Sequence, residues 1–213
     1  MEATFSYVDL SGFTALTEAH GDEVAADVAE RFVVLIEDAL GAEDRILKTV
    51  GDAALVSSPD PDSAVVFLCA LYELLAEQES FPGVRAGVHH GSATVRGPEV
   101  YGQAINLAAR IAAHAHSGQA FATAVVAEAA ERAGIEVTKL GEFDLHNIAR
   151  PVVLYDLDVR AAEGDAVEDP VCRMELERDR APARLRYKHV DYYFCSLLCA
   201  GDFSRNPHLY AFD

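Results

Sequence analysis

The stretch that decides the fold is Tyr7-Val8-Asp9-Leu10-Ser11-Gly12-Phe13-Thr14, read together with Lys48-Thr49-Val50-Gly51-Asp52. In the first stretch, an apolar β-type run ends in Asp9 and turns into a helix, so a carboxylate lies beside free helix N-terminal amides. The second is a Gly-Asp turn between apolar runs, which predicts a β-hairpin with Asp52 at its tip. If the strands are neighbours, the two aspartates could share two divalent cations over a triphosphate. Taken singly, Asp9 could equally be a helix cap and Asp52 a turn residue.

Composition limits the class of protein. The chain has 213 residues, 51% of them hydrophobic, which suffices for one medium domain with a real core and a small second unit. The net charge of −18 argues against nucleic-acid binding, because no broad basic surface is present. The apolar runs are too short to span a bilayer, and the N-terminus does not have the pattern of a signal peptide. We therefore expect a soluble, cytoplasmic protein that binds neither nucleic acid nor membrane.

Hydrophobic spacing predicts alternating strands and helices over residues 4–159. One long amphipathic helix is expected from about Leu16 to Leu40, ended by Gly41. The other expected elements are strands at 4–9, 45–50, 53–57, 84–89, 119–122, 135–143 and 152–159, a turn or short hairpin at 91–98, and helices at 64–78, 100–115 and 124–132. This order predicts an α+β sheet with helices mostly on one face.

Four motifs follow one another along this first unit: Val8 to Thr14, Lys48 to Ala53, Arg85 to Gly91 and Tyr101 to Arg110. Together they closely resemble the catalytic domain of class III nucleotidyl (adenylate/guanylate) cyclases over nearly all of residues 4–159. The resemblance implies a ferredoxin-like, palm-type fold for residues 1–160. It also implies conversion of ATP to 3′,5′-cyclic AMP and pyrophosphate, at a site shared between the two subunits of a homodimer.

The resemblance assigns roles to the residues in these motifs. Asp9 and Asp52 would hold two Mg²⁺ or Mn²⁺ ions, because both the attacking and the leaving oxygen carry negative charge that a divalent ion stabilises. The triphosphate would lie against residues 12–14, that is Gly12, Phe13 and Thr14. Asn106 and Arg110 stand four apart on one helix face, where the amide would orient the ribose and the guanidinium would meet developing phosphate charge.

Substrate choice rests on Lys48 and Glu99. Lys48 would donate to adenine N1, which favours ATP over GTP. Glu99 stands where relatives commonly carry aspartate, so its longer stem could shift the base. Relatives also often carry Lys-Gly near residues 145–148, where this chain offers His146 or Arg150, or a plain exposed turn. These departures keep two alternatives open, a weak or silent nucleotide-binding regulatory protein that responds to metal, and a cyclase for GTP or a pyrimidine nucleotide.

The histidines of the first unit suggest a second metal site less strongly. His89, His90, His114 and His116 are interpreted as strand and helix-end residues rather than as a metal cluster.

The last part of the chain, residues 169–213, follows a small acidic stretch at 161–168 that is typical of a linker. Three cysteines cluster here, which in a reducing compartment suggests metal more than disulfides. The run Asp169 to Met174, the run Tyr192 to Ser196, and Cys199 with Phe203, Pro207 and Tyr210 resemble a YHS domain, a small module related to treble-clef and TRASH-like metal-binding units. Cys172, Cys195 and Cys199 could supply three thiolates for Zn²⁺ or a softer ion such as Cu⁺. Candidates for a fourth ligand are His189, His208, Asp169 and water, and three buried reduced cysteines without metal remain an alternative.

Overall fold

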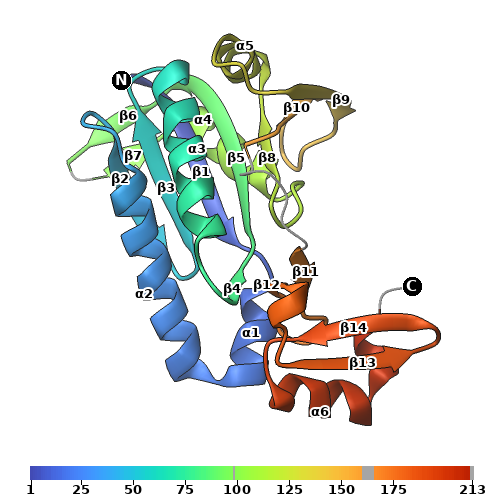
Figure 1. Ribbon diagram of the computed structural model, residues 1–213. Helices are drawn as coiled ribbons and strands as arrows, with labels where there is room; N and C mark the ends of the chain where they lie inside the picture. The colour runs from blue at the N-terminus through green and yellow to red at the C-terminus, as the bar shows by residue number, and fades with distance from the viewer. Residues whose placement is uncertain (98, 160–165, 212–213) are drawn as a thin grey trace.

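The computed structural model describes residues 1–97, 99–159 and 166–211 (Figure 1). The strands are β1 (Glu2–Leu10), β2 (Arg45–Val50), β3 (Ala53–Ser58), β4 (Phe81–Pro82), β5 (Val84–Ser92), β6 (Thr94–Arg96), β7 (Glu99–Tyr101), β8 (Ala120–Ala122), β9 (Val137–Phe143), β10 (Val152–Leu157), β11 (Ala166–Glu168), β12 (Met174–Glu177), β13 (Ala183–Tyr187) and β14 (Val190–Phe194). The helices are α1 (Phe13–His20), α2 (Asp22–Ala39), α3 (Pro61–Ala76), α4 (Gln103–Ala112), α5 (Ala124–Arg132), the 3₁₀ turn η1 (Arg178–Arg180), α6 (Leu197–Arg205) and α7 (Pro207–Tyr210). Within the described ranges, no helix is both long and apolar enough to cross a membrane.

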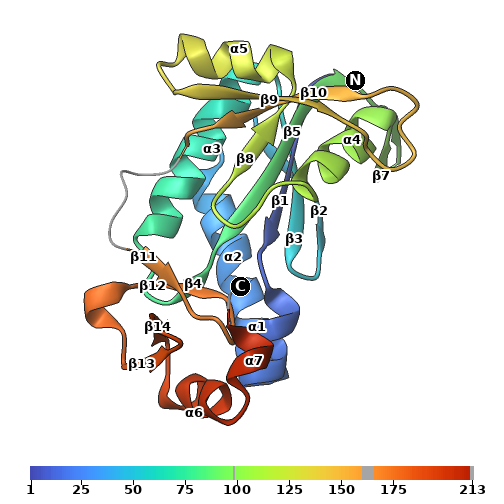
Figure 2. The same ribbon diagram turned by 90° about the vertical axis from the view of Figure 1, so that its right-hand side faces the viewer.

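A seven-stranded sheet in the order β2-β3-β1-β5-β8-β10-β9 forms the larger part of the molecule. Side chains of β1 alternate between its faces, as strand geometry requires. Val8 packs into the cluster beneath α2, α3 and α5, whereas Phe5 packs with Ala104 and Ala108 of α4. Three helices therefore cover one face and α4 covers the other (Figure 2). The predicted α+β fold with helices mostly on one face is confirmed.

The single long helix predicted from Leu16 to Leu40 is wrong. Two helices, α1 and α2, stand in its place, because Gly21 adopts φ 86° and ψ 169° between them. This conformation is open to glycine and strained for residues with a Cβ. Asp22 then begins α2 and puts a carboxylate in its first turn, where the helix dipole favours it.

Two other helix boundaries differ from the prediction. The helix expected at residues 64–78 begins at Pro61, because Asp60 caps it by accepting a hydrogen bond from the Ser63 amide at 2.8 Å. The helix expected at 100–115 is shorter, because residues 99–101 form strand β7 and pair with β6. The expected turn or short hairpin at 91–98 is this β6–β7 pair, with residue 98 outside the described residues.

The C-terminal part packs directly against the sheet domain (Figures 1 and 2). Strand β12 pairs with β11 on one side and with β4 of the first domain on the other. The β13–β14 hairpin and α6 enclose a core in which Leu16 of α1 and Ala25 of α2 join tail residues. Of the linker expected at 161–168, residues 161–165 lie outside the described residues and residues 166–168 form β11.

Candidate functional site

The two aspartates of the opening motifs meet at one end of the sheet. Asp9 lies near the end of β1 and pairs across the ladder with Ala53, the residue after Asp52. The Leu10 amide donates to the Asp52 carbonyl at 3.1 Å, which ties the hairpin turn to the end of β1. Burial raises the pKa of Tyr7, and the charges of Asp9 and Asp52 both raise it further. The two carboxylates are thus within electrostatic reach of the same side chain.

Asp9 already has a cationic partner. Arg85, its cross-strand neighbour on β5, donates from Nε at 2.7 Å and from Nη2 at 2.5 Å. Both bonds end on Oδ2, and Oδ1 has no hydrogen-bond partner among the described residues. Burial raises the pKa of Asp9, against the opposing effect of the Arg85 guanidinium. The nearby charge of Asp52 acts in the same direction as burial.

The turn between β1 and α1 is fitted tightly against the tail. Gly12 has φ 73°, and a Cβ placed on it would lie 2.4 Å from the Cβ of Arg173. The Ser11 hydroxyl is buried and has no hydrogen-bond partner in the described residues. Carboxylate oxygens, an unpaired hydroxyl and helix N-terminal amides form a donor set that suits Mg²⁺ or Mn²⁺ together with phosphate oxygens.

The other expected substrate residues lie on the surface of the single chain. Lys48 on β2, Glu99 on β7, and Asn106 and Arg110 on α4 are all exposed. Within the described residues none of these four side chains makes a hydrogen bond or an ion pair. Because α4 covers the face of the sheet opposite α2 and α3, its outer side is left open to solvent. His146 and Arg150 are exposed as well, in the turn between β9 and β10.

The three tail cysteines come together with a histidine from the first domain. Cys172 Sγ lies 3.4 Å from Cys195 Sγ, which lies 3.8 Å from Cys199 Sγ. The Nε2 atom of His20 is 3.6 Å from Cys195 Sγ and 3.5 Å from Cys199 Sγ. These four ligand atoms all lie within 4.8 Å of one another.

The residues proposed as a fourth ligand do not join the cysteine cluster. His189 and His208 are exposed and do not belong to the cluster. Asp169 is fully buried and accepts hydrogen bonds from the amides of Val171 and Cys195, both at 2.8 Å. His20, which occupies the position instead, was not predicted. Its only signal in the sequence is its place before Gly21, where a helix can end and turn its last side chain outward.

Within the described residues, no metal site is formed by His89, His90, His114 and His116. His89 bonds to the Thr123 hydroxyl at 2.9 Å, and His90 bonds to that of Thr4 at 3.0 Å. His114 lies beside the Arg110 carbonyl at 3.2 Å. Among the described residues, the group with metal-binding geometry contains none of them. His89 and His90 lie on β5, and His114 and His116 follow the end of α4, which agrees with their interpretation as strand and helix-end residues.

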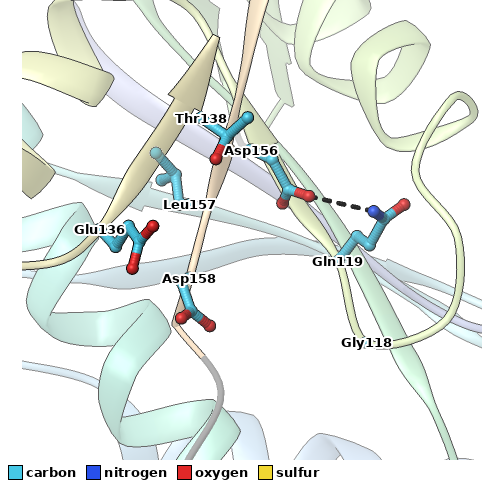
Figure 3. A pocket seen from close by; sticks show the side chains of 7 residues that line it. All are labelled: Gly118, Gln119, Glu136, Thr138, Asp156, Leu157 and Asp158. Carbon is cyan, nitrogen blue, oxygen red and sulfur yellow. Dashed lines mark hydrogen bonds between the residues drawn. The ribbon is translucent and has the colours of Figure 1, made fainter. Parts of the chain in front are cut away.

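A pocket of about 340 Å³ lies elsewhere, between β9, β10 and the segment before β8 (Figure 3). Its polar lining includes Glu136, Asp156 and Asp158, and Gln119 Nε2 donates to Asp156 at 3.0 Å. None of the residues in the four motifs lines it. The acidic lining does not suit a triphosphate.

Comparison with solved structures places the fold. The structure of adenylate cyclases from Trypanosoma brucei in their monomeric state superposes with a TM-score of 0.68 at 23% identity, over 76% of this chain and 89% of that one. The adenylyl cyclase CyaB from P. aeruginosa gives a TM-score of 0.61 at 19% identity, over 73% of this chain and 93% of the other. The sheet domain therefore has the fold of cyclase catalytic domains.

Two sequence relatives are named as adenylate cyclases as well. A pH-sensitive adenylate cyclase from Mycobacterium tuberculosis is 30% identical over 175 residues, which are 79% of this chain and 44% of the relative. An adenylate cyclase from Streptomyces coelicolor is 34% identical over 106 residues, 49% of this chain and 28% of the relative. The chain thus spans less than half the length of these curated relatives. Residues 167–212 match the family model of the YHS domain. The molecule combines a class III cyclase fold with a C-terminal YHS domain.

Proposed function

We propose that this protein is a nucleotidyl cyclase that converts ATP to 3′,5′-cyclic AMP and pyrophosphate. The observation that carries the proposal is the meeting of Asp9 and Asp52 at the turn that begins α1, in a fold shared with adenylate cyclases. The sequence relatives named as adenylate cyclases support the same reaction.

In the reaction, the ribose 3′-oxygen attacks the α-phosphorus and the bond from that phosphorus to the α,β-bridging oxygen breaks. The bridging oxygen leaves as part of pyrophosphate, and the 3′-hydroxyl proton passes to solvent. Asp9 and Asp52 would hold two divalent cations, Mg²⁺ or Mn²⁺, which would supply activation of the 3′-oxygen and stabilisation of negative charge on the leaving pyrophosphate. The backbone amides of residues 12–14 bind the triphosphate at the N-terminus of α1.

The remaining roles fall to exposed side chains. Lys48 donates to adenine N1, and Glu99 accepts from the adenine amino group. Asn106 orients the ribose, while Arg110 bonds to the phosphate oxygens as their charge develops. Because all four are exposed in the single chain, we infer that they face the aspartates of a second subunit in a homodimer.

A panel of the four ribonucleoside triphosphates, each with Mn²⁺, tests the proposal. ATP should yield cyclic product fastest, and Asp52→Asn should lower its formation by at least about 100-fold because metal-held charge stabilisation is lost. Asp38→Asn makes the same change on the exposed face of α2 and should leave the rate unchanged. Intact ATP binding without any cyclic product would refute the proposal, whereas faster turnover of GTP or a pyrimidine nucleotide would refute only the assignment of ATP.

The alternative of a weak or silent nucleotide-binding regulatory protein is favoured by one observation. The Arg85 guanidinium donates two hydrogen bonds to Asp9 Oδ2, so metal ions would have to share this carboxylate with Arg85. Turnover at the level of ordinary cyclases would exclude this alternative. Arg85→Ala separates the two functions, since a site held silent by the ion pair should gain activity when it is removed.

A further inference from the structure

We propose that His20, Cys172, Cys195 and Cys199 bind one tetrahedral Zn²⁺ ion that joins helix α1 of the cyclase domain to the YHS domain. The site then lies between the two domains and is not contained in the tail. The YHS domain alone supplies three of its ligands, and the cyclase domain supplies the fourth.

Three of the distances between the ligand atoms match a single tetrahedral ion closely, and all four atoms lie within 4.8 Å of one another. Zinc bonds of about 2.3 Å to sulfur and about 2.0–2.1 Å to nitrogen, set tetrahedrally, separate two sulfurs by about 3.8 Å and sulfur from nitrogen by about 3.6 Å. The Cys195–Cys199 sulfurs are 3.8 Å apart, and the His20 nitrogen lies 3.6 and 3.5 Å from the same sulfurs. The Cys172–Cys195 separation of 3.4 Å is slightly shorter, and it far exceeds the roughly 2.05 Å of a disulfide.

The chemistry of the ligands selects the class of metal. Thiolate and imidazole suit Zn²⁺, whereas Mg²⁺ and Mn²⁺ prefer the oxygen ligands found at Asp9 and Asp52. Cys172 and Cys199 are almost fully buried, at 0% and 1% exposure. His20 and Cys195 are half-buried. A complete set of four protein ligands is typical of a closed, structural zinc site rather than a catalytic one.

Neighbouring groups hold the ligand-bearing backbone in place. The buried Asp169 carboxylate accepts from the Cys195 amide at 2.8 Å and from the Cys172 amide at 3.4 Å. The Ser196 hydroxyl caps α6 by accepting from the Cys199 amide at 3.2 Å. All three cysteines are thereby fixed through their own main chains. Such outer-shell support is a usual companion of metal ligands.

His20 connects the proposed metal site to helix α1. His20 is the last residue of α1, and Gly12 precedes the first residue of the same helix. Gly12 packs against Arg173, the residue after Cys172. The segment that carries Cys172 therefore contacts α1 at its start, and the ion would hold α1 at its end. A bound tail metal would therefore fix α1 in place. The consequence for catalysis rests on the proposed function, in which the N-terminus of α1 binds the triphosphate.

Metal content and affinity test the site directly. The full chain, purified under reducing conditions without chelator, should contain one zinc per chain by elemental analysis. His20→Gln should weaken zinc binding by at least about 100-fold in competition with a chelating dye, since even outer-shell changes weaken it by about 10–100-fold. His208→Gln, an exposed tail histidine, is the matched control and should bind as the wild type does.

Two further measurements keep the proposal falsifiable if His20→Gln folds poorly. His20→Cys should restore wild-type stoichiometry as a four-thiolate site. Cobalt(II) should give the intense visible bands of tetrahedral coordination in the wild type, and His20→Gln should change them. Wild-type zinc affinity in His20→Gln, a metal-free wild-type chain, or a Cys172–Cys195 disulfide under reducing conditions would each overturn the proposal.

Hydrogen exchange tests the link to α1 without any assay of catalysis. Amides of α1 should exchange faster after zinc removal, while those of α5, at the opposite end of the sheet domain (Figure 1), should not change. Equal exchange in α1 with and without zinc would overturn the coupling. Because no nucleotide is present, failure of the cyclase proposal would leave these results unaffected.

Discussion

Replacement of Gly12 by alanine should destabilise the protein through two separable effects. Gly12 has φ 73°, and a residue with a Cβ in this left-handed conformation costs about 1–2 kcal/mol. The new methyl would also lie 2.4 Å from the Arg173 Cβ and 2.6 Å from its Cγ, and such overpacking typically costs about 1–3 kcal/mol. We therefore expect the free energy of unfolding to fall by about 2–5 kcal/mol, measured by urea denaturation followed by circular dichroism.

A double-mutant cycle separates the two effects. In an Arg173→Gly background the overlap is absent, so Gly12→Ala should cost only the backbone part, about 1–2 kcal/mol. Gly134→Ala provides the matched control, because Gly134 has φ 83° and no heavy atom lies within 4 Å of its added Cβ. An equal cost of Gly12→Ala in both backgrounds would refute the contact between the β1–α1 turn and the tail.

Three further outcomes are expected. Phe203→Ala should lower the free energy of unfolding by about 3–5 kcal/mol, because this ring is 1% exposed and packs within the tail core; a loss below about 1 kcal/mol in urea denaturation would contradict that packing. Mixing inactive Asp52→Asn with inactive Arg110→Ala should restore about a quarter of wild-type cyclic AMP formation, since half of randomly formed dimers keep one intact composite site of two; no recovery after subunit exchange would contradict the shared site. Burial lowers the pKa of His89, and its neighbour His90 adds to the effect. The unfolded chain therefore binds more protons below about pH 6.5, and stability should fall as pH falls from there towards the folded pKa. His89→Gln should reduce this loss in urea midpoints between pH 7 and pH 5, and an unchanged pH dependence would exclude the histidine bonded to Thr123 as its source.

The central sheet could be predicted from the sequence because its signals are local. Alternating side chains mark β1, and the Gly-Asp turn marks the β2–β3 hairpin, so both were placed almost to the residue. The break at Gly21 was missed, although His20-Gly21-Asp22 carries a helix stop followed by a helix start. The helical spacing of apolar residues continues through the break. This periodicity predicted one continuous helix despite the single glycine.

The candidate sites, too, could be predicted from the sequence only where their signals are local. The spacing of Cys172, Cys195 and Cys199 indicated a metal site from the sequence alone. Its fourth member, His20, stands 175 residues before Cys195, and no local pattern connects the two. Asp169 was one of four candidates for the fourth ligand, with His189, His208 and water. Only the fold shows that backbone amides occupy its oxygens.

The pairing of β12 with β4 has a practical consequence for any attempt to shorten the chain. A fragment cut after residue 160 would leave the backbone of Phe81 and Pro82 as an open strand edge. It would also uncover Leu16 and Ala25, whose apolar partners belong to the tail. We therefore expect the shortened fragment to aggregate more readily than the full chain, and fragment boundaries should be drawn to keep the two parts together.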